Sequence, residues 1–129
     1  MARFVVHHHF ARTEHYDLRL EMDFVLRSWA IPKDITLAEK KRILAVPTTD
    51  HPMEYINFEG ILPKGVYGAG VVKIWDTGTY DLVEKGPEKI VAEFHGKKLK
   101  GKYALVQFTD KRGKKNWLFF KMKQQKIRP

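Results

Sequence analysis

Polar and apolar side chains alternate without exception over residues 15–22, and this pattern constrains the fold more than any other in the chain. A repeat of two is the period of a β-strand, whose successive side chains point to opposite faces of a sheet. The segment therefore predicts a strand with an apolar face in the core and a polar face available for chemistry. The polar face carries His15, Asp17, Arg19 and Glu21.

Short runs rich in β-branched and aromatic residues recur along the chain, separated by turn signals such as those at residues 76–78 and 110–113. Their spacing favours antiparallel hairpins, and a closed barrel leaves no exposed sheet edge. We therefore predict a mainly β fold, a single-domain antiparallel β-barrel of about eight strands over residues 1–129. The predicted strands are Phe4–Val6, Tyr16–Met22, Val25–Ile31, Val71–Trp75, Thr79–Val83, Ile90–Phe94, Tyr103–Phe108 and Trp117–Met122.

One segment, Thr36–Leu44, has a helical pattern. Thr36 and Glu39 have the spacing of a capping box, in which two side chains satisfy free backbone N–H groups of the first helical turn. We predict one short helix there, in a crossover that covers one end of the barrel.

The composition excludes several classes of protein. The chain has no cysteine, which excludes a disulfide framework, a thiolate zinc site and a cysteine nucleophile. No apolar run approaches the roughly 18 to 20 residues of a membrane helix, and histidines and charges begin too early for a signal peptide. We expect a soluble, cytoplasmic protein without a membrane partner.

The net charge of +9 is concentrated in the last third of the chain. Residues 1–84 carry ten basic and twelve acidic side chains (net −2), whereas residues 85–129 carry fourteen and three (net +11). Such a surface attracts a polyanion, because lysine and arginine release counterions from phosphates. A solvated lysine-rich surface is the alternative from charge alone. The lysines expected to hold a nucleic acid are Lys97, Lys98, Lys100, Lys102, Lys114 and Lys115.

The polar face of the strand predicted at residues 15–22 carries a candidate metal site. His15 and Asp17 lie side by side on it, as a divalent cation needs for two adjacent coordination positions. A third ligand can come from the histidines just upstream: alternation places His7 and His9 on one face, and His9 is nearer to the pair. Two histidines and one carboxylate leave coordination positions open, which is typical of a catalytic site. Arg19 would then bind two oxygens of a phosphate.

A second polar cluster surrounds His51, which the following proline keeps out of helical conformation. A histidine that titrates near neutrality suits proton transfer, and Tyr55 offers a phenolic hydroxyl close by. For both clusters the alternative is structural: a hydrogen-bonded surface pair at residues 15–17 and a simple turn at residues 50–51. The glycine-rich stretch 58–70 lacks the strand–glycine–helix context of a phosphate loop and predicts a constrained loop.

Two other functions fit part of the pattern. With a distant histidine such as His95, the pair His15 and Asp17 imitates the iron site of a non-haem oxygenase. The small size of the chain and the neighbouring Arg19 speak against this. A non-catalytic β-barrel that binds single-stranded nucleic acid would explain the charge and the aromatic residues, but not the ligand face.

Several segments, in order along nearly the whole chain, carry a family resemblance. They are Phe4–Val6, His9, His15–Glu21, Ser28–Lys33, Asp50–Tyr55, Phe58–Gly60 and Trp117–Lys121. Together they resemble the 3′-phosphoesterase family, the nuclease modules fused to bacterial DNA ligase D, and this short chain is similar to the free-standing archaeal versions. A resemblance of this extent favours the metal-site interpretation of His15 and Asp17 over the surface pair.

The resemblance implies a manganese-dependent β-barrel enzyme that trims 3′ ends in DNA repair, with Co²⁺ or Zn²⁺ as alternative cations. Family members remove a terminal ribonucleoside as a phosphodiesterase and then the remaining 3′-phosphate as a phosphomonoesterase. The implied partners are DNA or RNA–DNA primer–template 3′ ends and a separate DNA ligase or polymerase, and the oligomeric state is left open. By position, His9, His15 and Asp17 match metal ligands, Arg19, His51 and Tyr55 match residues around the scissile phosphate, and Lys33 matches a phosphate contact.

Three departures from the family pattern concern the second reaction. The ligase-fused type has a longer polar N-terminal arm that helps the phosphomonoesterase step, whereas eight residues precede His9 here. Ile43 stands where a phosphate-binding arginine is expected, with Arg42 one position away, and Thr49 stands where an acidic residue is expected. The residues implied in the phosphodiesterase step are all present, so that reaction is the one we expect.

Overall fold

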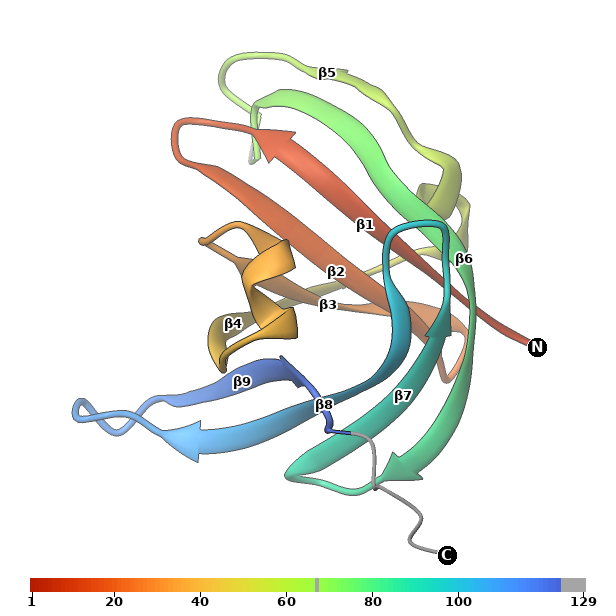
Figure 1. The fold of residues 1–129 in the computed structure, drawn as a ribbon. Helices are drawn as coiled ribbons and strands as arrows, with labels where there is room; N and C mark the ends of the chain where they lie inside the picture. The colour runs from red at the N-terminus through yellow and green to blue at the C-terminus, as the bar shows by residue number, and fades with distance from the viewer. Residues whose placement is uncertain (67, 124–129) are drawn as a thin grey trace, which may run out of the picture.

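The computed structural model describes residues 1–66 and 68–123, which form one antiparallel sheet with two short 3-10 helices beside it (Figure 1). Among these residues no helix has the length and hydropathy required to cross a membrane. The strands are β1 (Ala2–Phe10), β2 (Glu14–Met22), β3 (Val25–Ile31), β4 (Ile43–His51), β5 (Gly60–Leu62), β6 (Gly70–Lys85), β7 (Lys89–His95), β8 (Lys100–Thr109) and β9 (Lys115–Lys121), and the helices are η1 (Ile35–Glu39) and η2 (Met53–Asn57).

The sheet closes on itself. Neighbouring strands follow the order β1-β2-β3-β4-β9-β8-β7-β6, and β1 also pairs with β6. This last pairing closes a barrel of eight strands, and the three-residue β5 adds to β6 as a ninth. Closure pairs backbone groups that would otherwise form two exposed sheet edges. The predicted mainly β, antiparallel barrel of about eight strands is confirmed.

Strand β6 runs without a break through residues 76–78, so the predicted turn there is wrong. Both residues that suggested the turn have packing roles instead. The buried carboxylate of Asp76 accepts hydrogen bonds of 2.8–3.1 Å from the backbone N–H groups of residues 97–99. A Cβ atom on Gly78 would lie 2.7 Å from the carbonyl oxygen of His95, so the close approach of the two strands requires glycine. The two strands predicted around this point are therefore one, which pairs with β1 and then with β7.

The predicted helix over Thr36–Leu44 is wrong in its second half. Only η1 is helical, and Asp34 caps it by accepting the backbone N–H two residues later at 2.9 Å. At Ile43 the chain enters β4, which pairs with β9. Backbone pairing with a distant strand outweighs the weak local preference of this segment for a helix. The helix η1 packs against β4 and β9 with Ile35 and Ala38 buried in the core.

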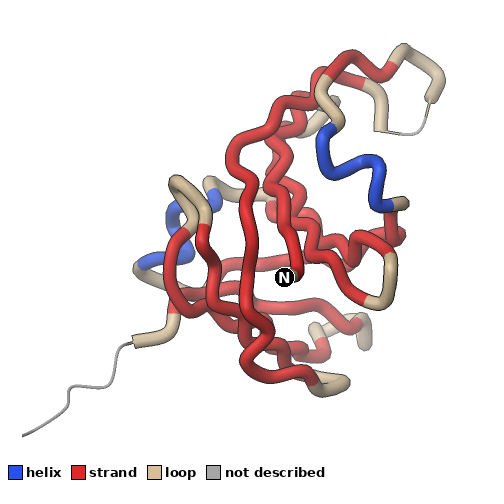
Figure 2. The backbone as a smooth tube through the Cα atoms, turned by 90° about the vertical axis from the view of Figure 1, so that its right-hand side faces the viewer, coloured by secondary structure: helices blue, strands red, loops and turns tan. Residues whose placement is uncertain are grey.

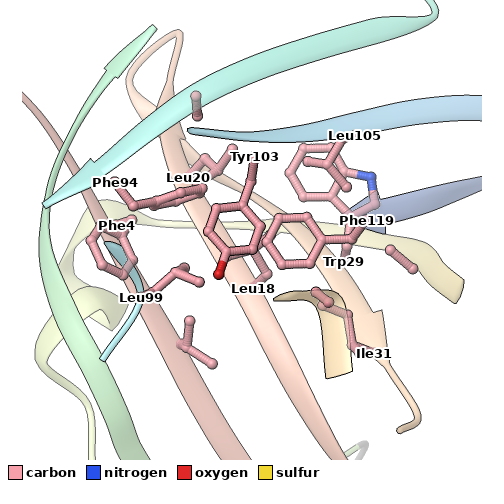
Figure 3. Packing of buried hydrophobic residues seen from close by; sticks show 14 of the residues in the cluster. Phe4, Leu18, Leu20, Trp29, Ile31, Phe94, Leu99, Tyr103, Leu105 and Phe119 are labelled. Atoms are coloured by element: carbon pink, nitrogen blue, oxygen red, sulfur yellow. The ribbon is translucent and has the colours of Figure 1, made fainter. Parts of the chain in front are cut away.

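Aromatic rings fill the barrel interior (Figure 3). Phe94 makes edge-to-face contacts with Phe4 and Tyr103, at 4.9 and 5.7 Å between ring centroids. Tyr103 in turn stacks on Phe119 at 5.0 Å. Edge-to-face and offset-stacked pairs are the arrangements that aromatic rings prefer. The apolar face predicted for β2 joins this core.

The outer faces of β1, β2 and β3 are covered as well. The helix η2 packs on them through a second small apolar cluster of Val5, Leu26 and Ile56, and Figure 2 shows the two short helices on opposite sides of the strands. The polar face of β2 is consequently buried too: Asp17 is 5% exposed and Arg19 is 4% exposed. Each face of this strand thus lies in an enclosed environment, one apolar and one polar.

Candidate active site

A cavity of about 320 Å³ lies on the outer side of β1–β4, under η2 and the segment that leads into β6. Strand register brings the polar residues to it, because β1 and β2 pair with His9 opposite His15 and with His7 opposite Asp17. Six of the seven site residues predicted from the sequence line this cavity, and Lys33 does not. The lining residues are His9, Ala11, His15, Asp17, Arg19, Ala30, Thr48, His51, Tyr55, Leu62 and Gly68.

His9, His15 and Asp17 form a compact cluster at one end of the cavity. Each offers one potential ligand atom, and the three atoms lie within 4.8 Å of one another. The Oδ2 atom of Asp17 is 3.2 Å from Nε2 of His15 and 3.5 Å from Nδ1 of His9. The structure therefore brings together the three residues that the sequence suggested as ligands.

Backbone carbonyl groups orient both imidazoles of this cluster. Nε2 of His9 donates to the carbonyl oxygen of Gly68 at 2.7 Å, and Nδ1 of His15 donates to that of Thr13 at 2.9 Å. A carbonyl oxygen only accepts, so these nitrogens carry the hydrogen, and in the neutral rings the other nitrogens present lone pairs to Asp17. Three lone pairs then converge with no hydrogen between them. Such a set fits a cation, whether a proton or a divalent metal ion.

The protonation behaviour of the cluster agrees with this geometry. Burial acts to raise the pKa of Asp17, but the hydrogen bond from His15 and the charge of Arg19 outweigh it and lower the pKa below its ordinary value. The hydrogen bond with Asp17 in turn raises the pKa of His15, against the effect of burial. Asp17 is thus an anion at neutral pH, and a metal ion would compete with the proton on His15.

Arg19 is held in place from several sides. Its Nε donates to Nδ1 of His7 at 3.0 Å and its Nη1 donates to the hydroxyl of Ser28 at 2.9 Å. Nη2 lies 3.4 Å from Asp17, and the guanidinium carbon is 5.0 Å from the ring centroid of Tyr55. Burial lowers the pKa of Arg19, yet an arginine stays charged in proteins. A fixed positive charge therefore stands beside the ligand cluster.

His7 is the partner of Arg19 that the sequence did not single out as functional. Burial, and then the charge of Arg19, lower its pKa to about 4, so its imidazole is neutral at pH 7. Because Nδ1 accepts from Arg19, Nε2 carries the hydrogen and donates to the carbonyl oxygen of Phe58 at 3.0 Å. Alternation along β1 puts His7 on the same face as His9, and this pattern could have indicated His7 as a site residue. For Ser28 the sequence held no comparable signal.

His51 ends β4 and lines the cavity together with the ligand cluster. Its Nδ1 is 2.9 Å from the carbonyl oxygen of Thr49 and 3.1 Å from Nη1 of Arg19. The first partner needs a donor and the second needs an acceptor, so the two contacts select opposite tautomers. Burial and the charge of Arg19 lower the pKa of His51, which favours the neutral ring. Its Nε2 can then present either a lone pair or a hydrogen.

Tyr55 lies on η2 and contacts His51 ring to ring, with 4.7 Å between centroids. It is stacked on Phe58 at 4.7 Å, and burial raises the pKa of its hydroxyl. These contacts fix the orientation of the phenol ring. Tyr55 therefore limits where the imidazole of His51 and the guanidinium of Arg19 can move.

The remaining residues of interest lie elsewhere. Lys33 is exposed, two residues past the end of β3. Ile43 is buried in the core at 3% exposure, and Arg42 does not replace a side chain there, because its guanidinium stacks on Phe120 at 4.8 Å. His95, suggested as a distant ligand of an oxygenase, is 2.8 Å from Asp81 on the outside of the barrel and does not line the cavity.

The chain belongs to the DNA Ligase D 3′-phosphoesterase domain family, whose family model matches residues 7–107. This family makes it a hydrolase acting on phosphoester bonds. It is 46% identical to the multifunctional non-homologous end joining protein LigD of Mycolicibacterium smegmatis, over 96% of this chain and 17% of that protein. It is 44% identical to the LigD protein of Mycobacterium tuberculosis H37Rv, over 95% of this chain and 16% of that protein. It is 42% identical to LigD of Pseudomonas aeruginosa PAO1, over 99% of this chain and 16% of that protein. The chain thus spans about one sixth of the length of these relatives.

Proposed function

We propose that the chain processes 3′ ends of nucleic acids as a manganese-dependent phosphoesterase, removing a 3′-terminal ribonucleoside as a phosphodiesterase. The observation that carries this proposal is the ligand cluster of His9, His15 and Asp17, whose free lone pairs converge beside the buried charge of Arg19. The family to which the chain belongs supplies the bond type, a phosphoester at a 3′ position.

The three cluster residues would hold the cation, and the two carbonyl groups behind the imidazoles keep the ligand nitrogens aimed at it. When bound, a divalent cation supplies Lewis-acid stabilisation of charge on a phosphoryl oxygen and lowers the pKa of a coordinated water. We propose Mn²⁺ for this role because the family resemblance implies it, and Co²⁺ or Zn²⁺ also fit a mixed set of imidazole and carboxylate donors.

The other residues of the cavity act on the substrate by charge and proton transfer. Arg19, fixed by His7 and Ser28, stabilises negative charge that develops on the phosphate, at no cost of reorganisation during the reaction. His51 lies within reach of a group bound between it and the cluster, and it accepts or donates a proton through Nε2. Tyr55 positions His51. Lys33, exposed past β3, would contact a more distant phosphate of the substrate.

The removal of the remaining 3′-phosphate is the second part of the proposal. Ile43 faces the core and Thr49 is an uncharged exposed residue, so neither supplies the charged group that the family resemblance associates with this step. We expect the phosphomonoesterase reaction to be slower than the phosphodiesterase reaction.

The proposed substrates are 3′ ends of DNA or of RNA–DNA primer–templates. The relatives carry non-homologous end joining in their names, and on that basis we propose a role in DNA repair alongside a DNA ligase or polymerase.

The test is an end-labelled primer–template with one 3′-terminal ribonucleotide, incubated with the protein and Mn²⁺. The wild-type protein should yield a strand shortened by one nucleoside that ends in a 3′-phosphate, and slowly a 3′-hydroxyl. His15→Ala should give no product, whereas His8→Ala is the control, because His8 pairs with Glu14 on the opposite face of the hairpin. Full activity in His15→Ala would overturn the cluster assignment. Nucleic-acid binding without any metal-dependent product would instead favour a non-catalytic binding barrel.

A further inference from the structure

A second concave site lies apart from the active-site cavity, where the end of η1 and the start of β4 meet the end of β9. It has a volume of about 460 Å³ and is strongly cationic, with five basic side chains against the single carboxylate of Glu39. We call it the basic groove. Its basic residues are Lys40, Lys41, Arg42, Lys121 and Lys123.

The charges of the basic groove are not neutralised by the protein. Between residues 1 and 123, position 67 aside, no carboxylate oxygen lies within 4.0 Å of a charged nitrogen of these five residues. Arg42 is held by the ring of Phe120, with its guanidinium 4.8 Å from the ring centroid, which leaves its N–H groups available at the edge of the stack. The groove therefore presents positive charge to an anion, and one of its side chains, Arg42, is held in place.

Strand pairing connects this groove to the ligand cluster along one face of the sheet. Asp17 pairs with Ala30, and Ala30 pairs with Val46, so these side chains share the outer face. Alternation along β4 puts Leu44 on the same face as Val46. Arg42 continues this alternation one residue before β4 begins. Leu44 pairs with Leu118 of β9, two residues before Phe120. The path between the two sites is thus uncharged, made of small and aliphatic side chains.

The length of this path can be estimated from strand geometry. Two interstrand steps of about 4.8 Å lie at right angles to an advance along the strand of four residues of about 3.3 Å each. The diagonal gives a straight-line distance of about 16 Å between Asp17 and Arg42. A duplex rises by about 3.4 Å per base pair along its helix axis, so a path of this length parallel to the axis spans about five base pairs.

We propose that the basic groove binds backbone phosphates of the substrate nucleic acid, about five base pairs along the helix axis from the end that occupies the active-site cavity. The inference rests on the proposed function, which places a 3′ end at the ligand cluster. It assigns a duplex contact to the junction of η1, β4 and β9, whereas the sequence suggested the lysines at positions 97, 98, 100, 102, 114 and 115. The groove contributes affinity for long substrates and nothing to the chemical step.

The first measurement is the affinity for an 18-base-pair duplex, by fluorescence anisotropy at several salt concentrations without added metal. The variant Lys41→Gln/Arg42→Gln should bind about tenfold more weakly at low salt, and the slope of log Kd against log salt should fall by about 2, as expected for two lost phosphate contacts. The comparison variant Lys97→Gln/Lys100→Gln removes the same charge from exposed positions outside the groove, which the sequence suggested for nucleic-acid binding, and should change both values little. Equal losses in the two variants, or none in the groove variant, would overturn the proposal.

A second measurement locates the contact along the substrate. Neutral methylphosphonate linkages placed on both strands four to seven base pairs from the 3′ end should abolish the difference between wild-type protein and the groove variant, whereas the same linkages ten or more base pairs away should preserve it. No effect of position would contradict the estimated path.

A third measurement separates this inference from the proposed function. Both double variants should hydrolyse the small chromogenic diester bis(p-nitrophenyl) phosphate as the wild type does, because it cannot reach the groove. If no protein turns over either substrate while the groove variant still loses duplex binding, the proposed function fails and the groove assignment stands. If cleavage of the long duplex proceeds with unchanged kcat/KM in the groove variant, the groove assignment fails and the proposed function stands.

Discussion

The Nε atom of Arg19 donates a hydrogen bond of 3.0 Å to Nδ1 of His7, so a buried guanidinium rests on a neutral imidazole. The same imidazole donates through Nε2 to the carbonyl oxygen of Phe58, in the segment that follows η2. His7 therefore links the strand that carries Arg19 to the segment that covers the cavity, and both of its nitrogens are committed to this task.

Replacing His7 by alanine should destabilise the protein markedly. The variant leaves the Nε–H of Arg19 and the carbonyl of Phe58 without their partners, and each unsatisfied buried group costs about 1–3 kcal/mol. We expect the free energy of unfolding in urea to fall by about 3 kcal/mol. The control His95→Ala removes an exposed pair with Asp81 and should cost less than about 1 kcal/mol. Comparable losses would show that the two hydrogen bonds of His7 contribute no more to stability than an exposed pair does.

Substitutions of two histidines that line the cavity, His15 and His51, should have different effects on cation binding and turnover. His15→Ala removes a ligand atom and should lose both Mn²⁺ binding and activity. His51→Ala should bind Mn²⁺ nearly as the wild type does, yet turn over the primer–template slower by about two or more orders of magnitude, as for a lost proton-transfer group. Titration calorimetry with Mn²⁺ and single-turnover cleavage give the two values. If the His51→Ala protein fails to bind the cation, the assignment of His51 to proton transfer is wrong.

Gly68 should affect cation affinity although it offers no ligand atom. Its carbonyl oxygen orients His9 at 2.7 Å, and its φ of +78° lies in the left-handed region that favours glycine. Gly68→Ala should displace this carbonyl and weaken Mn²⁺ binding by about tenfold, as other losses of a ligand-orienting contact do. Gly65→Ala is the matched control, since its φ is +87° and nothing lies within 4 Å of an added Cβ. If both variants bind Mn²⁺ equally well, the carbonyl of Gly68 does not orient the ligand.

Tyr80 should make the fold sensitive to alkaline pH. Burial raises its pKa to about 12, from an ordinary value of about 10, and its hydroxyl donates to the carbonyl oxygen of Glu21 at 2.6 Å. Above pH 10 the unfolded chain releases this proton while the folded chain retains it. The free energy of unfolding should therefore fall between pH 10 and 12, and be unaffected by this group below pH 10. In Tyr80→Phe the urea midpoint should fall less steeply over that interval, and an unchanged slope would argue against the assignment.

The parts of the site that could be predicted from the sequence are those set by local periodicity. Alternation along one strand is a property of neighbouring residues, so it placed Asp17 and Arg19 on one face and indicated His9 as the third member of the cluster. The β-rich runs likewise predicted the barrel, because closure follows from many short antiparallel strands.

The parts that could not be predicted depend on partners distant in sequence. The first two residues of β4, Ile43 and Leu44, fall in a segment with a helical pattern, and their pairing with β9 makes them part of a strand. Asp76 and Gly78 are residue types typical of a turn, which is why the sequence predicted one there. The carboxylate of Asp76 instead accepts hydrogen bonds from backbone N–H groups of the β7–β8 connection, which is distant in sequence. The hydrogen bond from Arg19 to Ser28 joins two neighbouring strands, and the spacing of the two residues along the chain does not predict it. The family resemblance named Lys33 by position, but its contact with a phosphate stays a prediction.

The pairing of β6 with β1 has a consequence for the order of folding. The β1–β2 hairpin is local and can form early, which brings His9 and His15 together, whereas the carbonyl group that orients His9 comes from a residue 59 positions away. Contacts of such separation in sequence form slowly, because they must overcome a large loss of chain entropy. A partly folded chain would hold the ligand residues without their alignment, so competence to bind the cation would report that the barrel has closed.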